Sequence, residues 1–417
     1  MAALISKARR NSRFEPKPLQ TQSPSQEDKL KKNLSLVFAF AVLISATAVA
    51  QEARQFHNHI RLLDPNQLIH PLTTPAGENP ATFACIYNLV STINPGCPID
   101  GTTAVPTGGR GIIVIVDAYD YPTATSDLST FSTQFGLPPA KFAKMYASGT
   151  KPSSGCTGVG GEGNWGLEES LDIEYAHAMA PHAIIVLMEA ASANNTDLFA
   201  AVQKANALIA AHGGKGEVSM SWGEGEFSGE TADDSNFTQS GVTYFASTGD
   251  APGTEYPSTS VNIVAVGGTV IVRNGSGDYT SQTAWSDGGG GDSSQEPIPS
   301  FQSAISGIVG KHRGVPDVSL IAGTGTAIYN TGGGISCGSG WEEVEGTSIA
   351  APSTAGIINA AGTFNKSSNA QNTEMYSNLG DSAVFTDITS GSCGTHSAIA
   401  GWDFCTGLGV PNGYSGK

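Results

Sequence analysis

The sequence predicts an α/β fold in which helices cover both faces of a mostly parallel central sheet. Short apolar runs of strand length, such as GIIVIVD at residues 111–117, lack the polar alternation of a half-exposed strand. They are therefore expected to be buried on both faces. Helical segments alternate with these runs along the chain, which is typical of a parallel sheet. Catalytic or binding side chains are then expected at the carboxyl edge of the sheet.

Three helices and five strands follow in order along the chain. A helix over residues 167–180 ends before Pro181, and an amphipathic helix over 197–212 ends at two glycines. A helix of small residues is expected over 348–361, with a proline near its start, where proline is tolerated. The segment 285–302 is rich in Gly, Ser and Pro and is expected to be a loop. The strands are expected at residues 111–117, 183–188, 218–222, 242–247 and 261–266.

The composition indicates a large, acidic, globular protein. The 417 residues are 39% hydrophobic, and 37 acidic against 21 basic side chains give a net charge of −16. This balance excludes a broad basic face, so nucleic acid is not expected as a partner. The ordinary hydrophobic fraction excludes a polytopic membrane protein. A strongly acidic chain also fits, although weakly, a protein that works at low pH.

Residues 1–50 have the layout of a secretory signal peptide with a long basic n-region. An uncharged run from Leu34 to Ala50 ends in the small residues that precede a cleavage site. An uncleaved anchor is the alternative, but the run is shorter than the roughly 20 residues that a membrane span needs. We therefore expect a secreted or extracytoplasmic protein with no stable membrane association after cleavage. Residues 51–78 are expected to be a linker or a propeptide remnant.

Six cysteines form an even set, and export permits disulfides. Sequence alone allows many pairings. Short loops favour Cys85 with Cys97 and Cys393 with Cys405, which leaves Cys156 for Cys337. No CxxC pair argues for zinc, so a structural role is favoured over a metal site.

The segment GTSIAAP at 346–352 places Ser348 at the start of a predicted helix. Free backbone N–H groups and the helix dipole can stabilise an oxyanion there, although a serine at this point can also be a simple N-cap. The string resembles the nucleophile segment of subtilisin-like serine peptidases. None of the histidines lies in the HGT-type segment that supplies the base of those enzymes, so another proton acceptor is needed. The eight histidines are His57, His59, His70, His177, His182, His212, His312 and His396.

Carboxylates are the candidate proton acceptors. Glu168 and Asp172 are four residues apart, so on a helix their side chains are neighbours, and no Lys or Arg occurs from 165 to 181. One of the two is expected to hold its proton to a higher pH, and the pair is expected to titrate as a unit. A solvated acidic face is the alternative. Asp250 follows a predicted strand at the expected carboxyl edge, where an Asx turn is equally compatible.

Taken together, these strings resemble the sedolisin family of serine-carboxyl peptidases, from about Asn79 to the C-terminus. The resemblance implies a subtilisin-like fold, with Glu168 as the general base for Ser348 and Asp172 as the partner that shares its proton. It also implies that Asp250 and the Ser348 N–H form the oxyanion hole. Carboxylates suit acidic working conditions, under which imidazole is protonated. Further matching strings are VDAYDYPTA from Val116, AHAMAP from Ala176, SMSWGEGE from Ser219, YPSTSVNIVAVGGT from Tyr256 and RGVPDVSLIA from Arg313.

The resemblance also implies a calcium site near the C-terminus. The implied ligands are two carboxylates and three backbone carbonyls, and such hard oxygen donors suit Ca²⁺. Without the resemblance these residues would be ordinary turn residues, because no EF-hand loop is present. The implied ligands are Asp387, Ile388, Ile399, Gly401 and Asp403.

The sequence thus predicts a secreted peptidase that cuts peptides or denatured proteins at acidic pH through an acyl-enzyme on Ser348. It is expected to be a monomer and an endopeptidase, with tripeptidyl-peptidase activity as a variant. The alternatives are a subtilisin-type Ser-His-Asp hydrolase and a catalytically inactive secreted binding protein on a peptidase fold. Members of the family commonly carry a long folded propeptide, which the short segment before residue 79 cannot supply.

Overall fold

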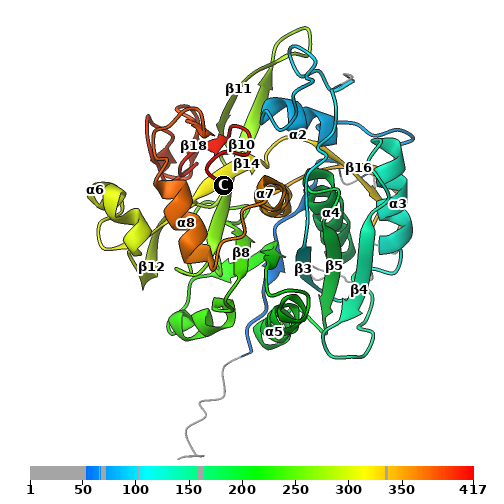
Figure 1. Ribbon diagram of the computed structural model, residues 1–417, viewed down its shortest axis with the longest axis horizontal. Coiled ribbons are helices and arrows are strands. Elements are labelled where there is room, and N and C mark those ends of the chain that lie inside the picture. The colour runs from blue at the N-terminus through cyan, green and yellow to red at the C-terminus, as the bar shows by residue number, and fades with distance from the viewer. Residues whose placement is uncertain (1–52, 65, 67–71, 101–102, 157–163, 334–336) are drawn as a thin grey trace, which may run out of the picture. The chain divides into compact units, whose positions relative to one another are not determined.

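A computed structural model describes residues 53–417, apart from 65, 67–71, 101–102, 157–163 and 334–336 (Figure 1). The predicted signal peptide lies outside the described residues. The predicted peptidase domain, from residue 79 to 417, and the described residues just before it belong to one unit, Ala53–Lys417.

The central sheet has eight strands within the described residues, in the order β11-β10-β8-β6-β3-β5-β4, with β14 also paired to β10. The pairing of β10 with β11 is antiparallel, and the other pairings in this sheet are parallel. The predicted mostly parallel, subtilisin-like α/β fold is confirmed. The strands are β3 (Ile112–Ala118), β4 (Lys141–Tyr146), β5 (Ile184–Ala190), β6 (Gly216–Met220), β8 (Val242–Ser247), β10 (Val264–Arg273), β11 (Tyr279–Ala284) and β14 (Val318–Ile321).

Helices cover both faces of this sheet, and β3 shows why. Its alternate side chains enter two different cores: Ile113 and Ile115 pack on the side of helices α4 (Trp165–Met179) and α7 (Thr347–Ala361). Val114 and its alternate neighbours pack on the side of α5 (Asn195–Ala211) (Figure 1). Both faces of the strand are apolar, as a continuous run of Ile and Val requires.

Helices α4 and α7 pack closely because α7 is made of small residues. A β-carbon at Gly356 of α7 would come within 2.6 Å of the Met179 side chain of α4. Larger residues at this contact would separate the two helices. The fold therefore fixes the start of α7 against the buried face of α4, where the predicted catalytic residues lie.

The remaining elements surround the sheet. The helices are α2 (Pro80–Ile86), α3 (Ala124–Gln134), α6 (Ser306–Val309) and α8 (Ser368–Tyr376), with 3-10 turns η2 (Glu230–Phe237) and η3 (Ser300–Ile305). The outer strands are β1 (His57–Asn58), β2 (Arg61–Leu62), β7 (Trp222–Gly225), β9 (Glu255–Tyr256), β12 (Gly291–Pro297), β13 (His312–Val315), β15 (Thr326–Asn330) and β16 (Gly340–Glu345). Near the C-terminus lie β17 (Phe385–Thr386), β18 (Ser392–Cys393), β19 (His396–Ser397) and β20 (Val410–Pro411).

Two local predictions were wrong. The segment 285–302 is not a loop throughout, because β12 pairs antiparallel with β13, with a register shift between Asp292 and Pro297. This pairing depends on a partner strand and not on apolar periodicity, so the composition gave no sign of it. The strand expected at 261–266 begins at Val264, after a turn in which Ile263 N–H donates to Ser260 O.

Part of the predicted linker is ordered against the rest of the unit. β1 pairs antiparallel with β7, and β2 pairs antiparallel with β16. The strands β7 and β16 come from distant parts of the sequence and belong to different sheets, so this short segment connects two sheets of the unit.

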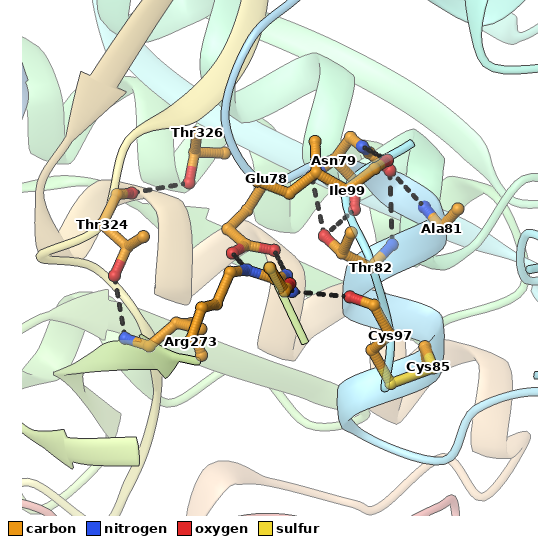
Figure 2. Close-up of polar contacts among 12 residues, drawn as sticks. Glu78, Asn79, Ala81, Thr82, Cys85, Cys97, Ile99, Arg273, Thr324 and Thr326 are labelled. Carbon is orange, nitrogen blue, oxygen red and sulfur yellow. Dashed lines mark hydrogen bonds and ion pairs between the residues drawn. A yellow bond between two sulfur atoms is a disulfide. The ribbon is translucent and has the colours of Figure 1, made fainter. Parts of the chain in front are cut away.

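The three favoured cysteine pairs are disulfides: Cys85–Cys97, Cys156–Cys337 and Cys393–Cys405. Figure 2 shows how the first of them helps to fix α2. Asn79 and Thr82 form a reciprocal capping box at its start. Beside it, the guanidinium group of Arg273 forms two hydrogen bonds to Glu78 (2.7 and 2.8 Å) and a third to the carbonyl of Cys97.

Disulfides are the feature of the structure that bears on location, because they form and persist in oxidising compartments. In the part of the chain that the structure describes, the helices are too short or too polar to cross a membrane.

Several carboxyl groups are buried in this unit without enough compensation to stay ionised at neutral pH. Burial raises the pKa of Glu217 on β6 to about 8, against the opposing effect of a hydrogen bond from Asn359 Nδ2 (2.8 Å). Burial raises the pKa of Glu342 on β16 to about 8 as well, and that of Glu189 on β5 to about 7. The folded state therefore holds these protons more tightly than the unfolded chain.

The fold is expected to be most stable in acid, and Glu217→Gln should reduce this dependence. The contribution of Glu217 is fully present below its ordinary pKa of 4.5 and is lost as the pH rises toward 8. Each unit of difference in pKa corresponds to about 1.4 kcal/mol, so the variant should be more stable than the parent at about pH 8, by at least ~1 kcal/mol, and equal to it at about pH 4. Denaturant unfolding at both values measures this. An equal gain in stability at about pH 8 in Glu374→Gln, at a partly exposed glutamate of α8, would contradict the assignment.

Candidate active site

Ser348 lies in the first turn of α7, directly after β16, and is fully buried. The N-cap of this helix is Gly346, so the alternative of a simple N-cap serine is wrong. Gly346 has φ +145°, and a β-carbon there would come within 2.1 Å of the His59 carbonyl oxygen. The Ser348 hydroxyl lies 3.5 Å from the Ser221 carbonyl oxygen. It is therefore not used to cap its own helix.

Glu168 and Asp172 lie one turn apart on α4, and both are fully buried. A solvated acidic face is excluded by this burial, which extends to every residue of the helix. Asp172 accepts a hydrogen bond from the Ser221 hydroxyl (2.9 Å). Ser221 thus contacts both Asp172, through its hydroxyl, and the Ser348 hydroxyl, through its carbonyl.

Burial raises the pKa of Glu168 well above its usual range, and the neighbouring carboxylates of Asp172 and Asp117 add to the shift. Ser348 lies close enough to oppose it, although neither carboxylate oxygen of Glu168 has a hydrogen-bond partner of ordinary geometry. Burial, and then Asp117, raise the pKa of Asp172 in the same way, while contacts with Ser221 and Glu168 oppose the change. The two groups are close enough to share a proton.

Asp117 is a third member of this cluster that the sequence analysis missed. It lies at the carboxyl end of β3, is fully buried, and has no hydrogen-bond partner among the described residues. Burial raises its pKa well above the usual range, with a further contribution from Glu189. The signal was present, because Asp117 ends a predicted strand just as Asp250 follows one. The same rule of strand ends could have found it.

Asp250 is joined to the start of α7 rather than to its own turn. Its Oδ1 accepts hydrogen bonds from Thr347 N–H (2.7 Å) and the Thr347 hydroxyl (2.9 Å). A β-carbon at Gly346 would meet both Asp250 Oδ2, at 2.8 Å, and the His59 carbonyl oxygen. Burial raises the pKa of Asp250 to about 6, although His59 and the bonds from Thr347 lower it. Below that pH the carboxyl group can donate a hydrogen bond.

The described histidines do not supply a base. The backbone of His59 contacts Ser348, because its carbonyl oxygen accepts from Ser348 N–H (3.2 Å). Its imidazole has other partners: Nδ1 lies 2.6 Å from Ser247 Oγ, and Nε2 lies 2.8 Å from Glu255. Within the described residues, no imidazole forms a hydrogen bond with Ser348. His70 lies outside them. The site therefore differs from a Ser-His-Asp arrangement.

Comparisons with known proteins find serine peptidases. Sedolisin from Pseudomonas sp. (strain 101) is 27% identical over 376 residues, which cover 81% of this chain and 60% of that protein. Kumamolisin from Bacillus sp. (strain MN-32) is 32% identical over 283 residues, covering 59% of this chain and 49% of that protein. The structure of Pseudomonas sedolisin, a serine-carboxyl proteinase complexed with two molecules of pseudo-iodotyrostatin, matches with a TM-score of 0.61 at 25% identity, over 81% of this chain and 96% of that one. The chain is thus similar in sequence and in fold to members of the sedolisin family.

Sphericase shares the fold, with a TM-score of 0.51 at 20% identity over 82% of this chain and 98% of that one. No family model matches the chain. The chain spans about half to three fifths of the length of the curated sedolisin relatives that it matches. The similarity to these relatives therefore concerns the domain described above.

The two aspartates of the expected calcium site lie on either side of the short strands β18 and β19. Asp387 Oδ2 accepts a hydrogen bond from Gly401 N–H (2.8 Å), and Asp403 Oδ2 accepts one from Ile399 N–H (3.0 Å). The disulfide between Cys393 and Cys405 closes the same loop. Neither aspartate forms an ion pair with Lys or Arg among the described residues.

A second group of potential metal ligands was not anticipated. The nitrogen atoms of His57 and His59 and a carboxylate oxygen of Glu255 lie within 4.8 Å of one another. His59 and Glu255 already form a close ion pair at 2.8 Å, and His57 lies 3.6 Å from the same oxygen. No sequence signal joined His59 to Glu255, because nearly two hundred residues separate them.

Proposed function

We propose that the chain is an acid-acting serine-carboxyl peptidase that hydrolyses peptide bonds through an acyl-enzyme on Ser348. One observation carries the proposal. The Ser348 hydroxyl lies beside the buried Glu168 and Asp172 pair, and Ser348 N–H donates to the His59 carbonyl oxygen (3.2 Å). Asp250 Oδ2 lies next to the same turn, at Gly346. This arrangement supports the roles of nucleophile, base and oxyanion donors that are assigned below.

Glu168 is the general base in this mechanism. It takes the proton from Ser348 Oγ as the oxygen attacks the carbonyl carbon, and Asp172 holds the orientation of Glu168 and shares the proton. A carboxylate of ordinary pKa is a weak base, so the raised pKa of Glu168 brings its basicity closer to that of the group it must deprotonate. Ser221 contacts both Asp172, through its hydroxyl, and the Ser348 hydroxyl, through its carbonyl oxygen. It therefore helps to fix the position of Asp172 relative to Ser348.

Ser348 N–H and the protonated carboxyl group of Asp250 stabilise the negative charge on the tetrahedral intermediate. Asp250 Oδ1 is held by Thr347, which leaves Oδ2 to carry the donated proton. The C–N bond then breaks, and the leaving amine takes the proton from Glu168. Water attacks the acyl-enzyme and gives a proton to Glu168, which returns it to Ser348 Oγ as the ester C–O bond breaks and the acid leaves.

Endopeptidase action is supported over tripeptidyl removal by the path of the chain's own segment through the site. The segment continues on both sides of His59, along β7 on one side and β16 on the other. Arg54, five residues before His59, still contacts Glu224 of β7 (3.3 Å). The site therefore has room for more than three residues on the N-terminal side of the attacked bond. A tripeptidyl peptidase would close the site at that end.

The proposal includes a secreted location and one Ca²⁺ ion held by Asp387 and Asp403 with the carbonyls of Ile388, Ile399 and Gly401. The proposal is supported by the two hard carboxylates, neither of which forms an ion pair with Lys or Arg among the described residues. Calcium would neutralise the two carboxylates and fix the loop. The loop supports the oxyanion side of the site, since Phe404 O packs against Gly290, whose N–H donates to Gly253 O, near Asp250.

Ser348→Ala and Glu168→Gln should each lower kcat by at least about 10³-fold, because the nucleophile and its base act as a unit. Hydrolysis of denatured casein at about pH 4 measures the effect, with mass analysis of the products. The matched control is Ser353→Ala in the same helix, where the buried hydroxyl has no hydrogen-bond partner among the described residues. Retention of more than about a tenth of the activity in Ser348→Ala would refute the assignment of the nucleophile.

Asp250→Asn and Asp250→Ala should differ in their pH profiles. With aspartate, activity should fall as the pH rises through about 6, because the donor proton is lost. Asparagine keeps an N–H donor at every pH, so its profile should extend to higher pH, whereas alanine should lose roughly 10²-fold in kcat throughout. Rates measured from about pH 3 to 8 test this. An unchanged alkaline limb in Asp250→Asn would remove Asp250 from the oxyanion hole.

Removal of calcium should lower the thermal stability. Chelation with EGTA should reduce Tm by several degrees, because a ligand held by the folded state alone stabilises it, by roughly 3 kcal/mol at a hundredfold excess over Kd. Added Ca²⁺ should restore Tm, and Asp403→Asn should abolish the response. Asp381→Asn, at a nearby turn where Asp381 accepts from Ala383 N–H, is the control. Calorimetry that shows no change with EGTA would contradict the site.

A further inference from the structure

His57 and His59 present two imidazole rings from one extended segment. His57 lies in β1 opposite Gly223 of β7, and His59 continues the same pairing, because its N–H donates to Ser221 O (3.2 Å). Side chains two residues apart on an extended strand lie on the same face of it. The centroids of the two rings are 5.3 Å apart, with an interplanar angle of 74°. The segment therefore offers two ring nitrogens to one neighbouring group.

Glu255 is that neighbouring group. It lies on β9, which belongs to the same three-stranded sheet as β1, with β7 between them. Its Oε2 lies 2.8 Å from His59 Nε2 and 3.6 Å from His57 Nε2. Ligands of a tetrahedral Zn²⁺ ion, with bonds of about 2.0–2.2 Å, lie roughly 3.4 Å from one another. Small rotations of the three side chains would thus bring their ligand atoms to one ion.

Gly223 keeps the space between these side chains clear. A β-carbon at Gly223 would come within 2.9 Å of Glu255 Oε2 and 3.1 Å of His59 Cε1. Because β7 lies between the two outer strands, a larger residue at this position would push the carboxylate and the imidazole apart. Glycine lets the side chains meet across the middle strand.

The hydroxyl of Ser247 can fix the ring of His59 in the orientation that a metal ion needs. His59 is almost fully buried, and its Nδ1 lies 2.6 Å from Ser247 Oγ. A metal ion on Nε2 requires the proton on Nδ1, and the hydroxyl can accept that proton's hydrogen bond. Without an ion, the hydroxyl can donate to Nδ1 while Nε2–H donates to Glu255. Both states leave the buried ring with partners.

Solvent reaches this group from the side of His57. The His57 side chain is 53% exposed, whereas those of His59 and Glu255 are mostly buried. Among the described residues, Glu255 forms no ion pair with Lys or Arg. The carboxylate of Glu224 adds to the negative potential at His57. A divalent cation thus has a path of entry and need not displace a permanent cation from Glu255.

We infer that His57 Nε2, His59 Nε2 and Glu255 Oε2 bind one Zn²⁺ ion, with a water molecule as the fourth ligand. In the part of the chain that the structure describes, this is the one group of three such side chains whose ligand atoms lie within 4.8 Å of one another. Two imidazole nitrogens favour a transition-metal ion over Ca²⁺ or Mg²⁺, which prefer oxygen ligands. The ion fastens the segment 57–59 to β9. The inference does not depend on the proposed peptidase function.

Isothermal titration calorimetry of the full chain with Zn²⁺ at about pH 7 tests the site, because the imidazole nitrogens must be free of protons to bind. Excess Ca²⁺ in the buffer fills the proposed calcium site, and Asp403→Asn should bind Zn²⁺ as the parent does. One Zn²⁺ ion per chain is expected. Absence of binding, or displacement of Zn²⁺ by an equal concentration of Mg²⁺, would overturn the inference.

His57→Gln is the decisive variant, because the exposed side chain of His57 can be replaced without disturbing the core. It should weaken Zn²⁺ binding by at least about tenfold. Glu255→Gln, which keeps a hydrogen-bonding group of the same shape, should have a similar effect. His312→Gln, at an exposed histidine of β13, is the matched control and should bind as the parent does. Equal affinity in His57→Gln and the parent, or an equal loss in His312→Gln, would overturn the site.

Ser247→Ala tests the support of the ring. It should weaken Zn²⁺ binding by about tenfold or more, since it removes the partner of His59 Nδ1. Hydrogen exchange gives a second measurement, in which Zn²⁺ should slow the exchange of amide hydrogens in residues 54–62 of the parent and not of His57→Gln. Zn²⁺ that binds without slowing exchange in this segment would contradict its attachment to β9.

Discussion

The burial of carboxyl groups without cationic partners is the constraint on which this structure depends. Glu168, Glu169, Asp172 and Glu174 all lie on α4 with no exposed surface, packed between α7 and the sheet. An ionised carboxylate in such surroundings costs many kcal/mol unless it is paired, so these groups keep protons to unusually high pH. One arrangement thus links stability in acid to the chemistry of the site. Burial likewise raises the pKa of Asp250, to about 6.

That arrangement needs rigid supports, and small residues provide them. Gly356 lets α7 approach α4, and Gly346 lets the helix begin beside a peptide carbonyl and Asp250. Asp250 is tied to Thr347 by two hydrogen bonds, so its carboxyl group is fixed relative to the helix that carries Ser348. The reacting groups are held by secondary structure and not by long loops, which limits the misplacement that would slow the reaction.

The sequence predicted the features that arise from local patterns. Continuous apolar runs predicted the strands of the sheet, and the four-residue spacing of Glu168 and Asp172 predicted their proximity on one helix. The features that it missed depend on contacts between distant segments. β12 has no apolar period and forms only because β13 lies beside it. The pairing of His59 with Glu255 joins an irregular segment to a short strand, and only the folded chain brings them together.

The segment in the cleft also changes the electrostatics of the site. His59, and more weakly Arg61, lower the pKa of Asp250, which burial raises. Arg61 is itself held in place by Glu345 (2.7 Å) and Asp287 (2.5 Å). His59 and Arg61 therefore make Asp250 release its proton at a lower pH than burial alone would set. In the proposed mechanism, the pH range over which Asp250 can donate a hydrogen bond thus depends on the segment that lies beside it.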